Sequence, residues 1–161
     1  MKLIFLDIDG VLNSETTTLQ TKSGFDLVDI DKVLLLKRLI DETGAKVVLS
    51  SSWRYGWVNA TAEDLVKDNP IYQDFCELRD LLKEYGIILS YKTRVEMNVP
   101  SRANEILGFL KGWGGEEIEN YVILDDEPYN SILEKNWIKT ETEIGLTEEH
   151  LNKALRILKG E

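Results

Sequence analysis

The sequence predicts an α/β fold, with one domain over residues 1–161 and a mainly parallel sheet of about five strands. Short apolar runs alternate along the chain with stretches in which apolar residues recur at helical spacing. The runs are apolar at consecutive positions, which is typical of strands buried on both faces of a parallel sheet. A length of 161 residues suits one domain, 43% hydrophobic content is enough for a full core, and neither an internal repeat nor a linker interrupts the chain.

The first apolar run, residues 2–6, is expected to organise the rest of the chain, because it stops abruptly at Asp7-Ile-Asp9-Gly10. Ligands of parallel sheets bind at the carboxyl ends of the strands, where Asp7 and Asp9 are predicted to lie. Residues two apart on an extended strand point the same way, so the two carboxylates are expected to crowd one spot. At about 4 Å they would repel by about 4 kcal/mol, which a divalent cation or a shared proton would offset. The alternative is a strand that ends in two solvated acids capping a turn.

Helices and strands are expected to alternate after this strand. Residues 13–22 are polar and without periodicity, which indicates a loop or small hairpin. A helix is expected from Asp29 or Asp31 to about Glu42, followed by Gly44 as its stop. The later expected elements are a strand over 46–50, a short helix near 62–67, a helix from Pro70 to Gly86, a strand over 87–89, a helix opened by Pro100 and Ser101, a strand over 121–124, a short helix near 131–135, a strand over 137–139 and a helix after Thr147.

Three details of these elements are also predicted. His150 stands three residues after Thr147, where a capping box has Glu or Gln, so no full capping box is expected. The same histidine is expected on the surface. Cys76 has no second cysteine to pair with and is expected to be a partly buried thiol.

Further polar residues stand at strand ends or at a helix start. Ser51 and Ser52 follow the strand over 46–50, Asp125 and Asp126 follow the strand over 121–124, and Arg102 opens a helix. Taken singly, the serines would be turn residues, the acidic pair a solvated turn, and Arg102 a surface charge. Taken together, they predict a site at one edge of the sheet. Aromatic residues beside the serines either face a substrate or pack in the core: Trp53, Tyr55 and Trp57.

These motifs resemble the haloacid dehalogenase (HAD) superfamily of phosphohydrolases. The first motif of that superfamily, D-x-D-G-[TV]-[LV], is matched from Asp7 to Leu12, and a Ser, an Arg and an acidic pair follow in the superfamily's order. Segments at 51–54, 102–106, 124–126 and 145–147 resemble one branch more closely, the HAD domains in Swiss-army-knife RNA repair proteins. The resemblance implies a three-layer, Rossmann-like HAD fold. The segment between Arg54 and Val99 is too short for a large separate domain, so little or no cap is expected over the site.

The resemblance also implies a role for each motif residue. Asp7 would attack phosphorus and form an aspartyl phosphate, while Asp9 would protonate the leaving group and then activate water. Ser51 and Ser52 would bind the phosphoryl group, with Ser50 as the alternative to Ser51, and Arg102 would complement its charge. Mg²⁺ would be held by Asp7, by the Asp9 backbone carbonyl and by the acidic pair, where Asp126 is the first choice for direct ligation and Asp125 the second.

The composition narrows the choice of partners. A net charge of −10 argues against broad nucleic-acid binding, and the absence of a long apolar run argues against a membrane protein. The lone cysteine and the lack of a signal peptide predict a cytoplasmic location. We expect a Mg²⁺-dependent phosphatase that acts on a phosphorylated substrate of unknown identity. The alternatives are a catalytically silent phosphate-binding or protein-interaction domain, and a phosphatase of nucleic-acid ends.

Overall fold

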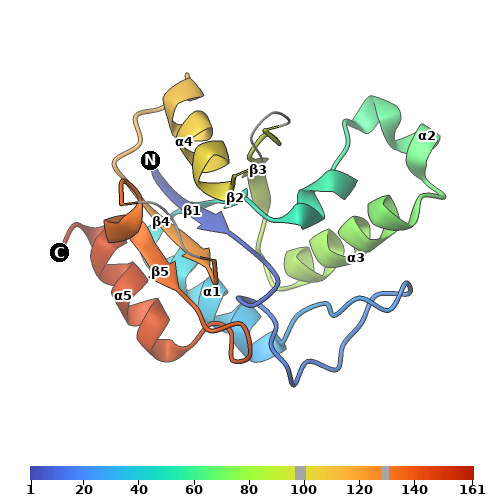
Figure 1. Ribbon diagram of the computed structural model, residues 1–161, viewed down its shortest axis with the longest axis horizontal. Coiled ribbons are helices and arrows are strands. Elements are labelled where there is room, and N and C mark those ends of the chain that lie inside the picture. Colours follow the sequence, from blue (N-terminus) through green and yellow to red (C-terminus); the bar gives the residue numbers. More distant parts are fainter. Residues whose placement is uncertain (97–100, 128–130) are drawn as a thin grey trace.

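A five-stranded parallel sheet forms the centre of the protein in a computed structural model that describes residues 1–96, 101–127 and 131–161 (Figure 1). The strands are arranged in the order β3-β2-β1-β4-β5, and every neighbouring pair is parallel. Their bounds are Lys2–Leu6 for β1, Lys46–Leu49 for β2, Leu89–Lys92 for β3, Asn120–Asp125 for β4 and Trp137–Lys139 for β5. The order reverses beside β1, which is where parallel sheets bind their ligands.

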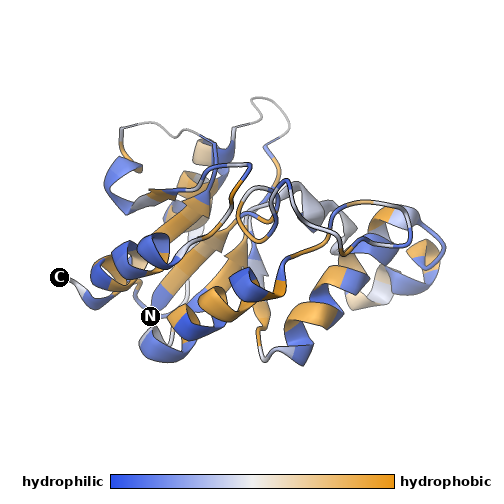
Figure 2. Cartoon of the chain, turned by 90° about the horizontal axis from the view of Figure 1, so that it is seen from below, coloured by the Kyte–Doolittle hydropathy of each residue, from blue (hydrophilic) through white to orange (hydrophobic). Residues whose placement is uncertain are grey.

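The helices lie on both faces of this sheet, so the molecule has three layers (Figures 1 and 2). On β1, Ile4 and Leu6 pack into one apolar cluster with α1, α3 and α5, while Leu3 and Phe5 pack into a second cluster with α4. This double burial explains why the strand is apolar at consecutive positions. The α-helices span Ile30–Thr43 (α1), Glu63–Val66 (α2), Pro70–Glu84 (α3), Arg102–Gly112 (α4) and Glu148–Lys159 (α5). The predicted α/β fold is confirmed.

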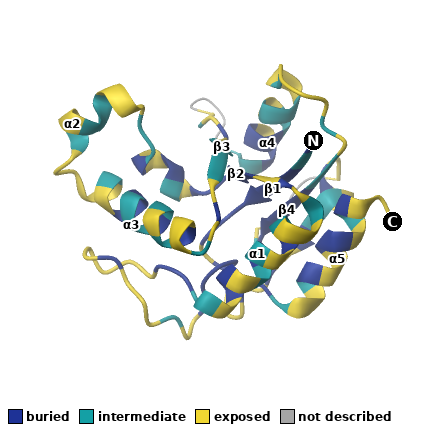
Figure 3. Ribbon diagram, turned by 180° about the vertical axis from the view of Figure 1, so that it is seen from behind, coloured by how far each residue is buried: buried dark blue, intermediate teal, exposed yellow. Residues whose placement is uncertain are grey.

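Shorter helices and loops complete the chain. Three 3-10 helices span Ser52–Gly56 (η1), Ala60–Ala62 (η2) and Glu134–Asn136 (η3). Between β1 and α1 the chain runs as a loop that is buried at both ends and mostly exposed over residues 15–26, with one isolated antiparallel bridge, Gln20 to Asp26 (Figure 3). This loop and α3 lie on the same side of the molecule, where they flank the sheet edge that carries the predicted site (Figure 1).

Most predicted elements agree with the structure within one or two residues. Helix α1 begins after Asp29 and ends at Gly44, whose φ of 68° gives the left-handed C-cap that was expected. Asn69 caps α3, and Ser101 caps α4 by accepting a hydrogen bond from the Asn104 N–H at 3.3 Å. Pro100, the other residue expected to open α4, lies outside the described residues. Cys76 is partly buried, as predicted.

Three predictions of local structure are wrong. Strand β3 begins at Leu89 and not at residue 87, because Ile87 is still bonded through its N–H to Leu82 and the chain needs two residues to return from α3 to the sheet. Residues 131–133 form a turn rather than a helix, and only the 3-10 helix η3 follows. The third concerns α5, where Thr147 forms a full capping box with His150.

His150 takes the part that Glu or Gln has in other capping boxes. Its Nδ1 accepts a hydrogen bond from the Thr147 backbone N–H at 3.1 Å, and the ring is half-buried rather than at the surface. Burial lowers the pKa of His150, with a smaller contribution from Lys153. A neutral ring is what this hydrogen bond requires, because a protonated Nδ1 cannot accept.

Among the residues that the structure describes, no helix has both the length and the apolar character that crossing a membrane requires.

Candidate active site

Three aspartates meet at the carboxyl ends of β1 and β4. Asp7 directly follows β1, Asp125 ends β4, and Asp126 comes next in the chain. Leu6 and Leu124 are partners in the parallel register, and the Asp7 N–H donates to the Leu124 carbonyl at 3.0 Å, so the two strands end side by side. One carboxylate oxygen from each of the three residues lies within 4.8 Å of the others. Asp7 and Asp125 are buried, and Asp126 is partly exposed.

This concentration of acids changes the protonation of Asp7. Burial, followed by the charge of Asp125, raises the pKa of the Asp7 carboxyl to about 7, against a smaller opposing effect of Arg102. Three carboxylates therefore face one nearby guanidinium in a largely buried volume. An arrangement of this kind favours a bound cation, and oxygen ligands suit Mg²⁺.

Arg102 is the positive charge in contact with this cluster. Its Nη1 lies 2.9 Å from Asp125 Oδ2 and 3.3 Å from Asp7 Oδ1. The guanidinium reaches them because Arg102 is the first residue of α4, the helix that follows β3 along the chain. The structure thus brings together three of the predicted motifs, at Asp7, at Arg102 and at the acidic pair.

Asp9 is oriented differently from the sequence-based expectation. It is exposed, and it does not belong to the group of acids formed by Asp7, Asp125 and Asp126. The expected crowding of the Asp7 and Asp9 carboxylates assumes an extended strand, whereas β1 ends at Leu6 and Asp9 belongs to the turn that follows. Instead, Asp9 Oδ1 accepts a hydrogen bond from Asn13 Nδ2 at 2.9 Å and Asp9 Oδ2 accepts one from Trp53 Nε1 at 3.2 Å.

The turn after β1 leaves room for Asp126. Gly10 has a φ of 79°, and a Cβ atom built on it would lie 2.2 Å from Asp126 Oδ2. Only glycine combines this left-handed backbone with so close an approach. The Asp126 carboxylate also accepts a hydrogen bond from Thr142 Oγ1 at 2.6 Å, and Thr140 Oγ1 donates to the Gly10 carbonyl at 2.6 Å.

The serines after β2 have three different environments. Ser51 Oγ caps η1 by accepting from the Trp53 N–H at 3.3 Å, whereas the buried Ser50 Oγ has no hydrogen-bond partner among the described residues. Both serines are fully buried, while Ser52 is exposed and lines a pocket. The choice between Ser50 and Ser51 as phosphate ligand stays a prediction.

A buried ion pair connects the serine segment to α4. Arg54 Nη2 lies 2.7 Å from Glu105 Oε2, with side chains only 3% and 5% exposed, and Arg54 Nη1 donates to the Ser51 carbonyl at 2.7 Å. Glu105 is one turn along α4 from Arg102. This pair fixes the segment that carries the serines relative to α4, the helix that carries Arg102.

The aromatic residues near the serines divide between the core and a pocket. Trp57 stacks on Phe75, with ring centroids 5.5 Å apart, and packs against the core. Trp53 also packs against the core, and together with Tyr55 it lines a pocket of about 590 Å³ that includes Asp9 and Gly10. Core packing is therefore confirmed for Trp53 and Trp57, and a substrate-facing role of Trp53 and Tyr55 stays a prediction.

Several residues of this region were missed by sequence reasoning. Asn13, Thr140 and Thr142 belong to none of the motifs, and Glu105 lies within the segment 102–106 without a role of its own assigned to it. Thr140 directly follows β5 and Thr142 comes two residues later, so the rule that polar residues at carboxyl ends of parallel strands gather at one edge was enough to find them. Asn13 and Glu105 give no comparable signal. The turn after β1 decides which groups Asn13 meets, and Arg54, the partner of Glu105, is distant in the sequence.

Comparison with known proteins gives one match. A search of curated proteins and a search of solved structures found no match. Residues 3–151 match the family described as the HAD domain in Swiss Army Knife RNA repair proteins, a range that includes every residue of the cluster described above. The match supports a phosphohydrolase of the HAD type, and the acidic cluster is compatible with a divalent metal. The chain belongs to the family of HAD domains in Swiss Army Knife RNA repair proteins.

Proposed function

We propose that this protein is a Mg²⁺-dependent phosphomonoester hydrolase that works through an aspartyl phosphate on Asp7. The observation that carries the proposal is the buried cluster of Asp7, Asp125 and Asp126 with Arg102 in contact with it. Three carboxylates this close together repel one another when they are ionised, unless a cation lies among them. A surface turn would not need such a cluster, so the cluster indicates a functional site. The hard oxygen donors and the single arginine fit Mg²⁺.

The metal would be held by the carboxylates of Asp7 and Asp126 and by the Asp9 carbonyl. Asp125 is the second choice within the acidic pair, because Arg102 and the Glu127 N–H already bind its two oxygens. When bound, Mg²⁺ supplies positive charge against the oxygens of the phosphoryl group.

The protein residues account for two steps. In the first, a carboxylate oxygen of Asp7 attacks phosphorus while the ester oxygen departs with a proton from Asp9, which leaves Asp9 ionised. In the second, Asp9 takes a proton from a water molecule, whose oxygen attacks phosphorus and breaks the bond to Asp7. Phosphate is released and both aspartates return to their starting states. Ser51 and Ser52 hydrogen-bond the phosphoryl oxygens, and Arg102 complements their charge and holds Asp7 in place.

The position of Asp9 supports its role as acid and base. Hydrogen bonds from Asn13 and Trp53 hold its carboxylate where Asp9 lines the pocket, outside the acidic cluster. A group that exchanges protons with a leaving oxygen and with water needs this access, and the nucleophile does not. We therefore assign Asn13 and Trp53 as positioning residues for Asp9.

The substrate is a second question, and the family description gives one candidate. Because the family is named for RNA repair proteins, a phosphatase of nucleic-acid ends is the second function we consider. The net charge of −10 weighs against tight binding of a polyanion. A cytoplasmic location and a phosphorylated substrate as partner remain our predictions.

The test is phosphate release from a panel of nucleotides, sugar phosphates, phosphopeptides and 3′- or 5′-phosphorylated oligonucleotides, with and without Mg²⁺. We expect hydrolysis by the wild type only with the metal, none by Asp7→Asn, and full activity in the surface control Asp64→Asn. Near-normal turnover by Asp7→Asn would refute the nucleophile assignment. Phosphate binding by a wild type that hydrolyses no member of the panel would favour the catalytically silent alternative.

A further inference from the structure

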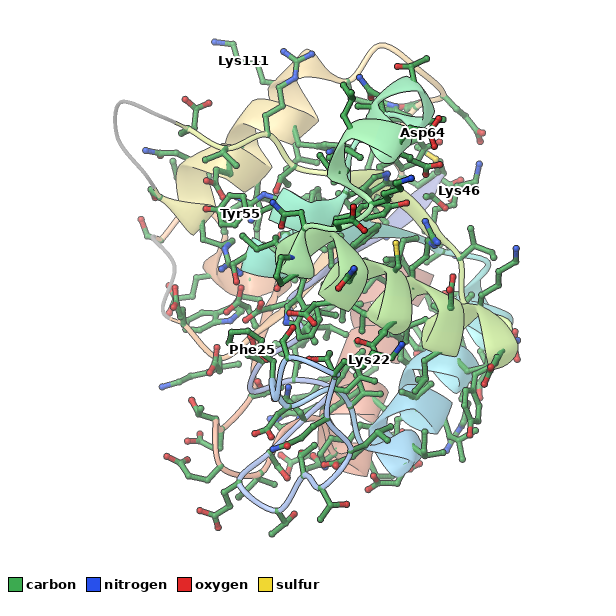
Figure 4. The ribbon with its side chains drawn as sticks, turned by 90° about the vertical axis from the view of Figure 1, so that its right-hand side faces the viewer. Lys22, Phe25, Lys46, Tyr55, Asp64 and Lys111 are labelled. Atoms are coloured by element: carbon green, nitrogen blue, oxygen red, sulfur yellow. The ribbon has the colours of Figure 1, made fainter. Side chains whose placement is uncertain are left out.

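The pocket beside Asp9 has walls that are apolar and in part aromatic. Two aromatic side chains are strongly exposed in it, Phe25 at 62% and Tyr55 at 57%, and Trp53 and Ile71 also contribute. Figure 4 shows Phe25 and Tyr55 on one face of the molecule, the former on the loop after β1 and the latter on η1. Large exposed apolar groups that converge on one concavity are typical of a ligand site.

The shape of this pocket depends on tight packing of η1 against α3. A Cβ atom built on Gly56 would lie 2.3 Å from the Ile71 carbonyl oxygen and 2.6 Å from Phe75 Cβ, so only glycine permits this contact. The packing brings Tyr55 of η1 beside the first two turns of α3, which contribute Ile71 and Asp74 to the pocket. The walls are therefore fixed by regular elements on one side and by the loop after β1 on the other.

The charged residues of the pocket are all acidic. Besides Asp9, it is lined by Glu15, Asp26, Asp74 and Glu143, and among the described residues no lysine, arginine or histidine lines it. Residues 97–100 and 128–130, outside the described part, include no basic residue either. A leaving group with its own negative charge would be repelled by this lining.

Asp74 adds an independent indication of what the pocket binds. Its side chain is only 6% exposed, and its Oδ1 has no hydrogen-bond partner in the part of the chain that the structure describes. A buried carboxylate that lacks a donor is costly, and in native proteins such groups are usually satisfied by a ligand, an ion or water. Oδ1 has almost no accessible surface of its own, so an amine in the pocket would first meet the negative charge of this carboxylate and would donate to Oδ1 once the side chain turns toward the pocket.

From the walls, the acidic lining and Asp74 together, we propose that the pocket binds the leaving group of the substrate and that this group is an apolar ring carrying an amine. The substrate class is then a small phosphate monoester with a neutral or cationic leaving group, rather than a polynucleotide or a polyphosphate. This inference rests on the proposed function for the phosphoryl half of the substrate, whereas the ring half depends only on the pocket.

Three aryl phosphates separate the contribution of the amine from that of the ring. Tyramine phosphate, 4-ethylphenyl phosphate and 3-(4-phosphonooxyphenyl)propionate share a two-carbon chain that ends in an ammonium group, in no further group and in a carboxylate, respectively. The ends are remote from the phenolic oxygen, so the three leaving groups have similar reactivity. We expect kcat/KM to fall in that order. The value for the amine compound should exceed that for the ethyl compound by at least about tenfold, since an interaction with a buried charge changes affinity by about this factor. Equal values for the three compounds would overturn the proposal, as would a higher kcat/KM for a 3′-phosphorylated oligonucleotide.

Variants of the pocket residues test whether the preference for the amine compound arises in the pocket. Asp74→Asn should bring the ratio of kcat/KM for the amine and ethyl compounds close to one, whereas the exposed control Asp64→Asn should keep the ratio of the wild type. Tyr55→Ala and Phe25→Ala should raise KM for all three aryl phosphates more than for ethyl phosphate. An Asp74→Asn enzyme that keeps the full preference for the amine would refute the role of Asp74.

A binding measurement distinguishes failure of the pocket from failure of the proposed function. Calorimetric titration with free tyramine and free 4-ethylphenol needs no turnover, and we expect the wild type to bind tyramine more tightly, with the difference lost in Asp74→Asn. If the wild type hydrolyses no phosphate ester but shows this binding, the pocket assignment stands and the catalytic one fails. If it hydrolyses all three esters equally and binds the two phenols equally, the reverse holds.

Discussion

Asp7 and Asp9 are two residues apart, yet their side chains lie in very different surroundings. Asp7 is 6% exposed among other acids, whereas Asp9 is exposed and held by two neutral donors. A nucleophile is best kept rigid and dry, and an acid and base needs access to the leaving group and to water. The difference in environment therefore suits a division of roles between the two aspartates.

The leaving-group dependence of Asp9→Asn tests this division. If Asp9 protonates the ester oxygen, the variant should lose at least about a hundredfold in rate on alkyl phosphates and much less on p-nitrophenyl phosphate, whose leaving group needs no proton. Because the same residue activates water, the variant should also show a burst or trap phosphate on Asp7. Rapid-quench kinetics with both substrates is the measurement. An equal loss on the two, without a burst or a trapped intermediate, would remove Asp9 from the acid-base role.

Metal binding at the acidic pair gives a second test at the residue scale. Asp126→Ala should weaken Mg²⁺ binding more than Ser51→Ala does, because the first removes a charged oxygen ligand and the second a neutral phosphate contact. Thr142→Val removes the hydroxyl that bonds Asp126 and should have a smaller effect than Asp126→Ala. Calorimetric titration of Mg²⁺ into the three variants decides the order. Equal affinities for Asp126→Ala and Ser51→Ala would exclude Asp126 as a direct ligand.

At the scale of elements, η1 and α4 are joined by the buried pair of Arg54 and Glu105. Both partners lie close to site residues, and Arg54 also binds the Ser51 carbonyl. The connection positions two motifs that are far apart in the sequence. It also leaves one atom unsatisfied, since Arg54 Nε has no partner among the described residues.

Glu105→Ala should therefore lower the free energy of unfolding by about 3–5 kcal/mol, because it leaves a buried guanidinium without its partner. Asp80→Ala is the matched control, since it breaks a surface ion pair with Arg79 and should cost less than about 1 kcal/mol. Urea denaturation of both variants measures the difference. Similar costs for the two would mean that Arg54 finds another partner or water, and that the pair does not fix the position of α4.

For the whole molecule, the raised pKa of Asp7 links stability to pH. The folded protein holds a proton on Asp7 up to about pH 7, whereas the unfolded chain releases it near 3.8. Between these values the folded state binds more protons, so this group lowers the stability of the metal-free protein as pH rises. The ionised form carries the full penalty above about pH 7, of the order of 4 kcal/mol.

The variant Asp7→Asn removes that penalty. Without metal at pH 8 it should be more stable than the wild type by a few kcal/mol, and the difference should vanish toward pH 4, where Asp7 is protonated in both states. Saturating Mg²⁺ should stabilise the wild type at pH 8 and Asp7→Asn much less. Thermal unfolding across pH, with and without Mg²⁺, gives the curves, and a single transition would also support one domain over residues 1–161. A difference independent of pH would show that Asp7 is not the group responsible.

Much of this protein is determined by local sequence pattern alone. Consecutive apolar residues identified β1, β2 and β4, helical spacing identified α1, α3 and α5, and the polar residues that follow the strands indicated which edge of the sheet to inspect. Such patterns report which successive residues are buried, and burial of a strand or helix is set mainly by its own side chains. The places of Asp7, Asp125 and Asp126 follow from this, because a parallel sheet brings the ends of its strands together.

What only the tertiary structure decided is the direction of individual side chains and the pairing of segments that are far apart in the sequence. The sequence does not encode locally that Asp9 faces Asn13 and Trp53, that His150 closes a capping box, or that Arg54 meets Glu105. The direction of a side chain beyond the end of a strand depends on a few backbone dihedral angles, which the packing of the whole chain sets. The pocket is the extreme case, since Phe25, Tyr55 and Asp74 come from three separate segments and form one surface only when α3 packs against η1.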